Sequence, residues 1–73
     1  MEAIHIGDHL QELLDARGMA ESEFIRTMGL AEDIGRNLLH GKERVTEDIA
    51  RRLEEIFNVS QSFWLGLQKL YER

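Results

Sequence analysis

The fold is decided by residues 20–46, which read AESEFIRTMGLAEDIGRNLLHGKERVT. Apolar residues recur at helical spacing on both sides of Gly29, and glycine is the residue that most readily ends a helix. The pattern therefore predicts two short amphipathic helices, residues 21–28 and 32–40, joined by a tight turn. This spacing is typical of the helix-turn-helix, whose second helix enters the major groove of DNA.

The first turn of that second helix is poorly suited to DNA. It opens with Ala31, Glu32 and Asp33, whereas a surface that meets phosphates gains from hydroxyl groups and cations. The sequence thus combines a scaffold typical of DNA-binding proteins with an acidic end on the helix that would read the bases.

Composition limits the function classes for these 73 residues. We expect a single domain over residues 1–73, because a chain of this length buries one modest core. The absence of cysteine excludes disulfides and thiolate metal sites, and no apolar run reaches the roughly twenty residues that span a bilayer. We expect a cytoplasmic protein with no membrane partner, because the N-terminal segment lacks the basic-then-apolar order of a secretion signal.

The net charge of −5 is spread unevenly along the chain. Most of the acidic excess lies in residues 1–30, whereas acids and bases balance within residues 31–45. A protein of this overall sign attracts phosphate weakly at long range. We therefore expect non-specific DNA binding to be weak and strongly salt-dependent.

Three further helices are expected outside the motif. One spans residues 7–17, one lies between a Thr46 cap and an Asn58 stop, and one follows a Ser60 cap to the C-terminus. Apolar residues at helical spacing define the inward faces. The residues expected to share one core are Leu10, Leu13, Leu14, Phe24, Met28, Leu38, Leu39, Ile49, Leu53, Ile56 and Trp64.

Several short motifs resemble those of one known family. They are His5-x-Gly7, Leu10, Arg17-Gly18, Gly29, Leu38-Leu39-x-Gly41-Lys42, Thr46 and Phe63-Trp64-Leu65-x-Leu67-Gln68. This order resembles the HigA/VapI-type antitoxins of the Cro/repressor (XRE) helix-turn-helix class, and the last motif is the most discriminating. The resemblance implies an all-α, compact five-helix Cro/repressor-like bundle. It also implies a homodimeric, DNA-binding antitoxin that neutralises a cognate RNA-cleaving toxin and represses its own operon.

The sequence departs from this family where DNA is usually contacted. Ala20 and Glu21 stand where members usually carry Ser-Gln, and residues 31–33 replace a hydroxyl followed by cationic or small polar residues. Ala20 offers no oxygen to the free amides of the helix that it precedes. Gly35 stands at a β-branched core position, which costs up to about 1 kcal/mol of helix propensity, and we expect Ile34 to take over its burial.

Candidate DNA contacts remain on one stripe of the second helix of the motif. Arg36 can bind guanine O6 and N7, and Asn37 can bind adenine N6 and N7. Glu32 lies one turn before Arg36 and can pair with it, and the alternative interpretation is an ordinary solvated face. Lys42 and Arg44 follow in the loop where phosphates would be held. The candidate DNA-binding residues are Glu21, Glu32, Asp33, Arg36, Asn37, His40, Lys42 and Arg44.

The last expected helix carries a broad apolar stripe. A stripe at helical spacing is more often core or dimer interface than an aromatic platform for nucleic acid. It holds more apolar surface than one small core requires, so we expect a two-fold homodimer. The residues expected at its interface are Trp64, Leu67, Leu70 and Tyr71.

Enzymatic and metal-dependent functions find little support. His5 and His9 lie at i, i+4 but lack a third ligand, so we expect His5 to cap or pack at the helix start. No nucleophile is paired with a base at a recognisable spacing, and no loop is built to hold phosphate. We expect neither an enzyme nor a cofactor.

Two functions of different classes therefore remain. One is a DNA-binding transcriptional regulator or antitoxin that uses residues 32–44. The other is a helix-turn-helix scaffold that has lost operator binding and acts through protein contacts. Arg36, Asn37, Lys42 and Arg44 favour the first function, and the acidic helix tips favour the second.

Overall fold

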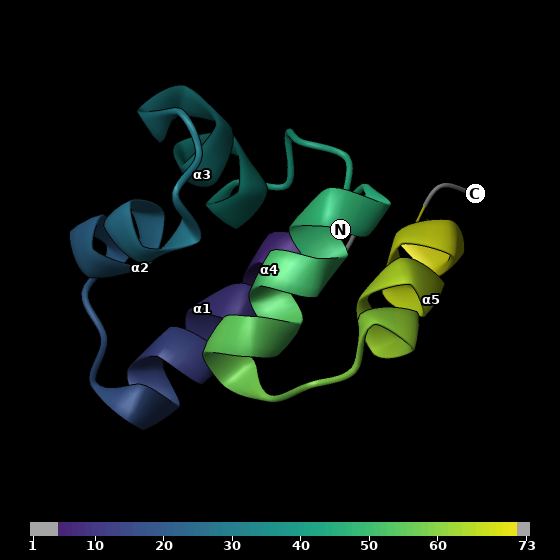
Figure 1. Ribbon diagram of the computed structural model, residues 1–73, viewed down its shortest axis with the longest axis horizontal. Coiled ribbons are helices and arrows are strands. Elements are labelled where there is room, and N and C mark those ends of the chain that lie inside the picture. The colour runs from purple at the N-terminus through teal and green to yellow at the C-terminus, as the bar shows by residue number, and fades with distance from the viewer. Residues whose placement is uncertain (1–4, 72–73) are drawn as a thin grey trace, which may run out of the picture.

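Five helices make up the part of the chain that the computed structural model describes, residues 5–71 (Figure 1). Their bounds are α1 (Ile6–Arg17), α2 (Glu21–Met28), α3 (Glu32–Leu39), α4 (Glu47–Phe57) and α5 (Gln61–Tyr71). This confirms the all-α, five-helix class. α3 ends one residue earlier than expected, because His40 leaves helical geometry and caps the helix.

Helix termini follow the side-chain chemistry of the sequence. The Thr46 hydroxyl accepts a hydrogen bond from the Ile49 N–H at 3.3 Å, and the Ser60 hydroxyl accepts one from the Phe63 N–H at 3.3 Å. Both caps were expected from the sequence. Among residues 5–71 no side chain caps α2, as Ala20 predicts.

α1 begins at a histidine cap that also joins it to α3. His5 Nδ1 accepts a hydrogen bond from the Gly7 N–H at 3.0 Å, and the His5 N–H donates to the Asp8 carboxylate at 3.2 Å. This capping box confirms the expected role of His5. The imidazole also covers Gly41, where an added Cβ would lie 2.3 Å from the His5 ring. The start of α1 is thereby fixed against the end of α3.

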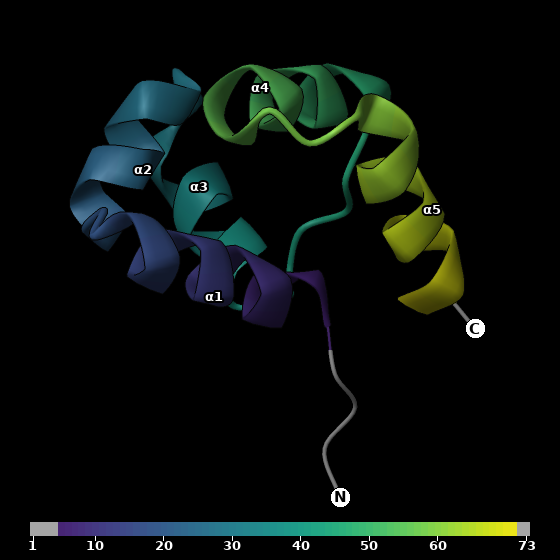
Figure 2. The same cartoon turned by 90° about the horizontal axis from the view of Figure 1, so that it is seen from below.

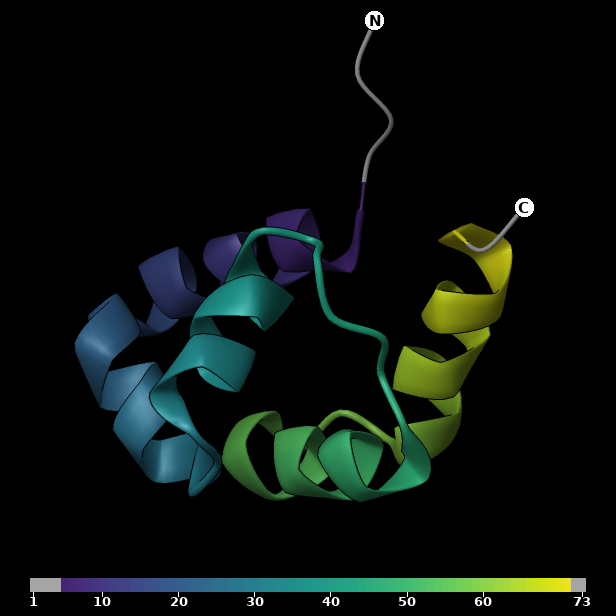
Figure 3. The ribbon, with the colours of Figure 1, turned by 90° about the horizontal axis from the view of Figure 1, so that it is seen from above.

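The helices follow one another around a shared interior. Figures 2 and 3 show α1, α2, α4 and α5 in sequence around the molecule, with α3 against α1 and α2. α4 packs on both α2 and α5. Figure 1 places α3 at the upper edge of the molecule, with α2 and α5 at opposite ends. One side of α3 therefore faces outward.

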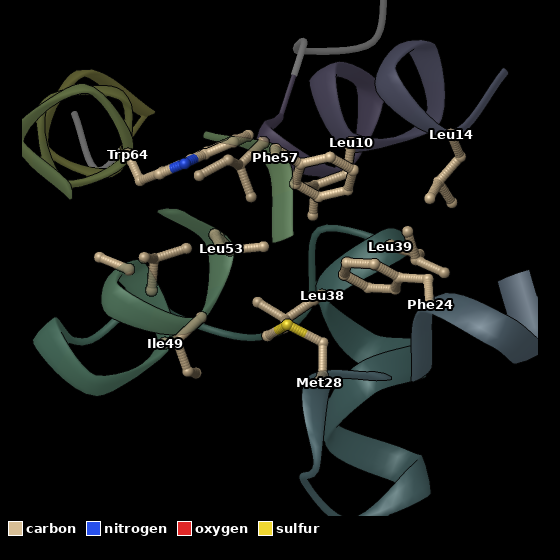
Figure 4. Close-up of a cluster of buried hydrophobic side chains, with 13 residues drawn as sticks. Leu10, Leu14, Phe24, Met28, Leu38, Leu39, Ile49, Leu53, Phe57 and Trp64 are labelled. Carbon is tan, nitrogen blue, oxygen red and sulfur yellow. The ribbon is translucent and has the colours of Figure 1, made fainter. Parts of the chain in front are cut away.

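Thirteen apolar side chains fill the interior (Figure 4). The expected core is largely confirmed, but Leu13 and Ile56 are only partly buried at its edge. The expected core list lacked Ile6, Val45, Ala50 and Phe57. The buried set is Ile6, Leu10, Leu14, Phe24, Met28, Leu38, Leu39, Val45, Ile49, Ala50, Leu53, Phe57 and Trp64.

Two arginines each join one helix to the C-terminal end of another. Arg52 of α4 donates to the Met28 carbonyl at the end of α2 at 2.8 Å, and Arg17 of α1 donates to the Phe57 carbonyl at the end of α4 at 2.8 Å. The Arg17 guanidinium also lies 5.2 Å from the centre of the Phe57 ring. Cations at helix C-termini satisfy free carbonyls and the helix dipole. These contacts hold α2, and with it the turn before α3, at a fixed orientation.

Candidate nucleic-acid interface

The outward face of α3 carries an ion pair one helical turn long. Arg36 donates to the Glu32 carboxylate, and 52% of the Arg36 side chain and 73% of the Glu32 side chain are exposed. The pairing expected from the i, i+4 spacing is confirmed. An exposed pair of this kind contributes about 0.5 kcal/mol or less. Arg36 is therefore held along the helix but can exchange Glu32 for another acceptor.

The neighbouring stripe of α3 is polar and more varied in exposure. Asp33 is exposed and accepts a hydrogen bond from the Ile34 N–H at 3.0 Å. Asn37 is half-buried, and His40 is exposed at the helix end. The structure thus brings Glu32, Arg36 and His40 to the exposed side of α3, whereas Asn37 lies closer to the rest of the protein.

Glu21 reaches the same region from the first turn of α2. It lines a hollow between α2 and α3 together with Glu32 and Arg36, over the apolar side chains of Ile25 and Leu30. Its carboxylate accepts a hydrogen bond from Gln11 of α1 at 3.0 Å. A carboxylate thus occupies the N-terminus of α2, where the free helix amides would otherwise favour a DNA phosphate.

Arg26 is a cation of this hollow that the sequence interpretation missed. It lies near the end of α2, is exposed, and lines the hollow that Arg36 also lines. Spacing along the chain gave no signal for it, because residues five apart, such as Glu21 and Arg26, do not share a face of a helix.

Lys42 and Arg44, in the loop after α3, lie next to different helices. Gly41 adopts a left-handed conformation with φ of 70°, and the Lys42 N–H donates to the Asn37 carbonyl at 2.8 Å. This tight stop keeps exposed Lys42 directly beyond the end of α3. Arg44 instead lines hollows beside α5, one with Tyr71 and one with Lys69. Of the two loop cations, Lys42 lies closer along the chain to the outer face of α3.

Gly35 is buried beneath a side chain of α2. A Cβ at this position would lie 3.0 Å from Cγ1 of Ile25, so α2 and α3 approach each other closely here. Ile34, which was expected to replace the missing side chain, is partly buried at the edge of the core. Ile25 from α2 is therefore the residue that covers Gly35.

The residues expected at a dimer interface differ in accessibility. Trp64 is completely buried, packs against the Phe57 ring at a tilt of 47°, and donates from its indole N–H to the Val59 carbonyl at 3.2 Å. Its assignment to the interface was wrong, because this side chain has no surface to offer a second chain. Leu70 is 51% exposed and Leu67 is half-buried. Phe63, which the interface prediction omitted, is 45% exposed.

Tyr71 is already engaged within its own chain. Its hydroxyl forms a 2.7 Å hydrogen bond with His9 Nε2, and the two rings stack with centres 6.1 Å apart. This contact joins α5 to α1. Within residues 5–71 no three histidine, aspartate or glutamate side chains gather as a metal site, and no helix in that range has the length and apolar character needed to cross a bilayer.

Comparisons with known proteins complete the description of the site. No family model matches the chain. The chain is 35% identical over 65 residues to YddM, an uncharacterised HTH-type transcriptional regulator of Escherichia coli K12, covering 89% of this chain and 69% of that protein. It also resembles the structure of an addiction module antidote protein of a HigA family from Coxiella burnetii. The TM-score is 0.84 at 30% identity, over 99% of this chain and 79% of that one.

Proposed function

This chain belongs to the HigA-type family of helix-turn-helix antitoxins and transcriptional regulators, and we propose that it binds double-stranded DNA with α3 in the major groove. The observation that carries the proposal is the exposed position of Arg36 on the outer face of α3. Arginine is the side chain that most often reads guanine. Neither relative is described as an enzyme, and the proposed activity needs no cofactor.

Phosphate contacts complete the proposed DNA interface. Lys42 follows α3 directly and is exposed, so it can hold a phosphate beside the groove that α3 enters. Arg26 supplies a second cation from the end of α2. Glu21, Glu32 and Asp33 oppose phosphates near the same surface. We therefore expect a modest affinity that depends on a matching base sequence more than on charge.

The finer function proposed is that of an antitoxin. The solved relative is an addiction module antidote protein, so we propose that this chain neutralises a cognate RNA-cleaving toxin and represses its own operon in the cytoplasm. Co-expression with a small basic ribonuclease-like reading frame beside its gene should stop the cleavage of cellular RNA. Continued cleavage in the presence of a stable complex would leave only the regulatory function.

A homodimer is part of the proposal. Phe63 and Leu70 are the large exposed apolar side chains among the described residues, and both lie on α5. Gly66 lies between them. Apart from its chain neighbours and the adjoining backbone of α5, no atom of residues 5–71 comes within 4 Å of the place where its Cβ would be. A glycine in an exposed helix interior costs about 1 kcal/mol. Close approach of a second α5 would offset that cost.

The second candidate function is a scaffold that acts through protein contacts alone. Carboxylates at the exposed starts of α2 and α3, Glu21 and Glu32 in particular, favour it, because they weaken attraction to any duplex. The protein's affinity for the duplex upstream of its own gene and for a scrambled duplex, measured at 50 and 200 mM salt, separates the two functions. DNA binding predicts a preference for the upstream duplex at both salt concentrations. Equal or absent binding supports the scaffold.

A further inference from the structure

With α3 in the major groove, the Glu32 carboxylate would lie between two rows of phosphates. Glu32 is the more exposed member of the pair, and it lies one turn before Arg36 on the outer side of α3. A lone carboxylate there would be repelled by phosphates. Its charge is instead offset by the guanidinium beside it, so both groups can enter a groove together.

The paired groups offer hydrogen-bond donors and an acceptor side by side. A guanidinium has five N–H donors, and a carboxylate accepts only. The ion pair engages Nη2 of Arg36 and one oxygen of Glu32, so the unit as a whole retains both kinds of group. A G·C pair shows the complementary set in the major groove, with acceptors at guanine N7 and O6 and a donor at cytosine N4.

An A·T pair fits the same unit poorly. Adenine N6 places a donor where guanine has an acceptor, and thymine O4 and its methyl group lie where cytosine has a donor. Arg36 would then meet a donor and Glu32 an acceptor. A unit of this kind gains specificity by repelling the wrong pair as well as by binding the right one.

We propose that Glu32 and Arg36 act together to read a single G·C pair. Arg36 donates to guanine N7 and O6, and Glu32 accepts from the N4 amino group of the paired cytosine. This inference rests on the proposed DNA binding and adds to it a specificity-determining role for Glu32. The acidic start of α3 then selects a sequence at the expense of general affinity.

The test begins with wild-type protein and a pool of random duplexes. In the site that it enriches, each cytosine is replaced in turn by N4-methylcytosine, which keeps the Watson–Crick pair but removes the N4 hydrogen that faces the major groove. We expect one cytosine in each half-site at which methylation weakens wild-type binding about tenfold or more. For Glu32→Ala that ratio should fall below about twofold. Its affinity for duplexes that lack the preferred pair should rise with the loss of a negative charge.

Glu12→Ala is the matched control. Glu12 is exposed on α1 and carries the same charge outside the helix-turn-helix, so this variant should keep the wild-type response to methylation. Arg36→Ala should lose both the guanine preference and the response to methylation at the same pair. If Glu32→Ala and wild type respond alike at every cytosine of an enriched site, the reading unit is wrong although DNA binding stands. If the pool yields no enriched duplex, the proposed function fails and the reading unit fails with it.

Discussion

At the scale of single residues, the exposed guanidinium of Arg36 is the most informative group in the molecule. Its removal leaves the core untouched and costs only an exposed ion pair, about 0.5 kcal/mol or less of folding stability. Arg36→Ala should nevertheless weaken binding to the preferred duplex by about 1–3 kcal/mol, because a base contact is lost. Binding to a scrambled duplex should change much less. Fluorescence anisotropy on both duplexes measures the difference, and equal losses on the two would show that Arg36 contacts phosphate.

The carboxylates at the start of α3 support a second prediction at this scale. Replacing both, as Glu32→Arg with Asp33→Ser, removes two negative charges and adds a cation at an exposed helix end. Affinity for random duplexes should rise, and its dependence on salt should become steeper. Titrations at two salt concentrations provide the measurement. If neither wild type nor this variant binds any duplex at low salt, groove reading by α3 is excluded.

At the scale of elements, α3 is held by the interior face that carries Leu38 and Leu39. Leu39 is 2% exposed and packs where α3 meets α1. Leu39→Ala should lower the free energy of unfolding by about 2–5 kcal/mol. Leu13→Ala serves as the control on α1, because Leu13 is only partly buried and should cost less. Urea denaturation measures both, and a Leu39→Ala loss below about half a kcal/mol would mean that α3 packs differently.

The helices could be predicted from the sequence because their signals are local. Thr46, Ser60 and the glycines that end α1 and α2 act on neighbouring amides and carbonyls, so their effect can be recognised without a fold. Val45 was missed because it lies in a loop outside any helical period, where its N–H donates to Gln68 of α5 at 2.8 Å.

The contacts between helices could not be predicted in the same way. An added Cβ on Gly7 would lie 2.2 Å from the Leu39 carbonyl oxygen, and Ile25 covers Gly35. Each depends on two elements that meet only after folding. The candidate site shows the same division: the Glu32–Arg36 pair follows from spacing, whereas Arg26 joins the site only through the packing of α2 on α3.

At the scale of the whole molecule, the exposed apolar side chains of α5 predict self-association. Wild-type protein should sediment as a dimer at micromolar concentration. Phe63→Ser with Leu70→Ser should sediment as a folded monomer, because both side chains are about half exposed in the single chain and contribute little to its core. A wild-type monomer, or a dimer that survives both substitutions, would remove α5 as the interface.

Gly66 provides an independent check of that interface. Gly66→Ala should stabilise the isolated chain by about 0.5–1 kcal/mol, because alanine favours the helix and the space around this position is open within residues 5–71. In a dimer that brings two α5 helices together at Gly66, the same methyl group should weaken association. Tighter association would place the contact elsewhere on the surface.

The central claim is that α3 contacts DNA, and backbone amide NMR during titration with the enriched duplex tests it most directly. Signals from residues 32–42 should shift most, since they contain the exposed face of α3 and the lysine that follows it. Signals from the exposed side of α5 should stay in place at a concentration where the protein is already dimeric. Shifts confined to α5, or a spectrum that the duplex leaves unchanged, would contradict the claim.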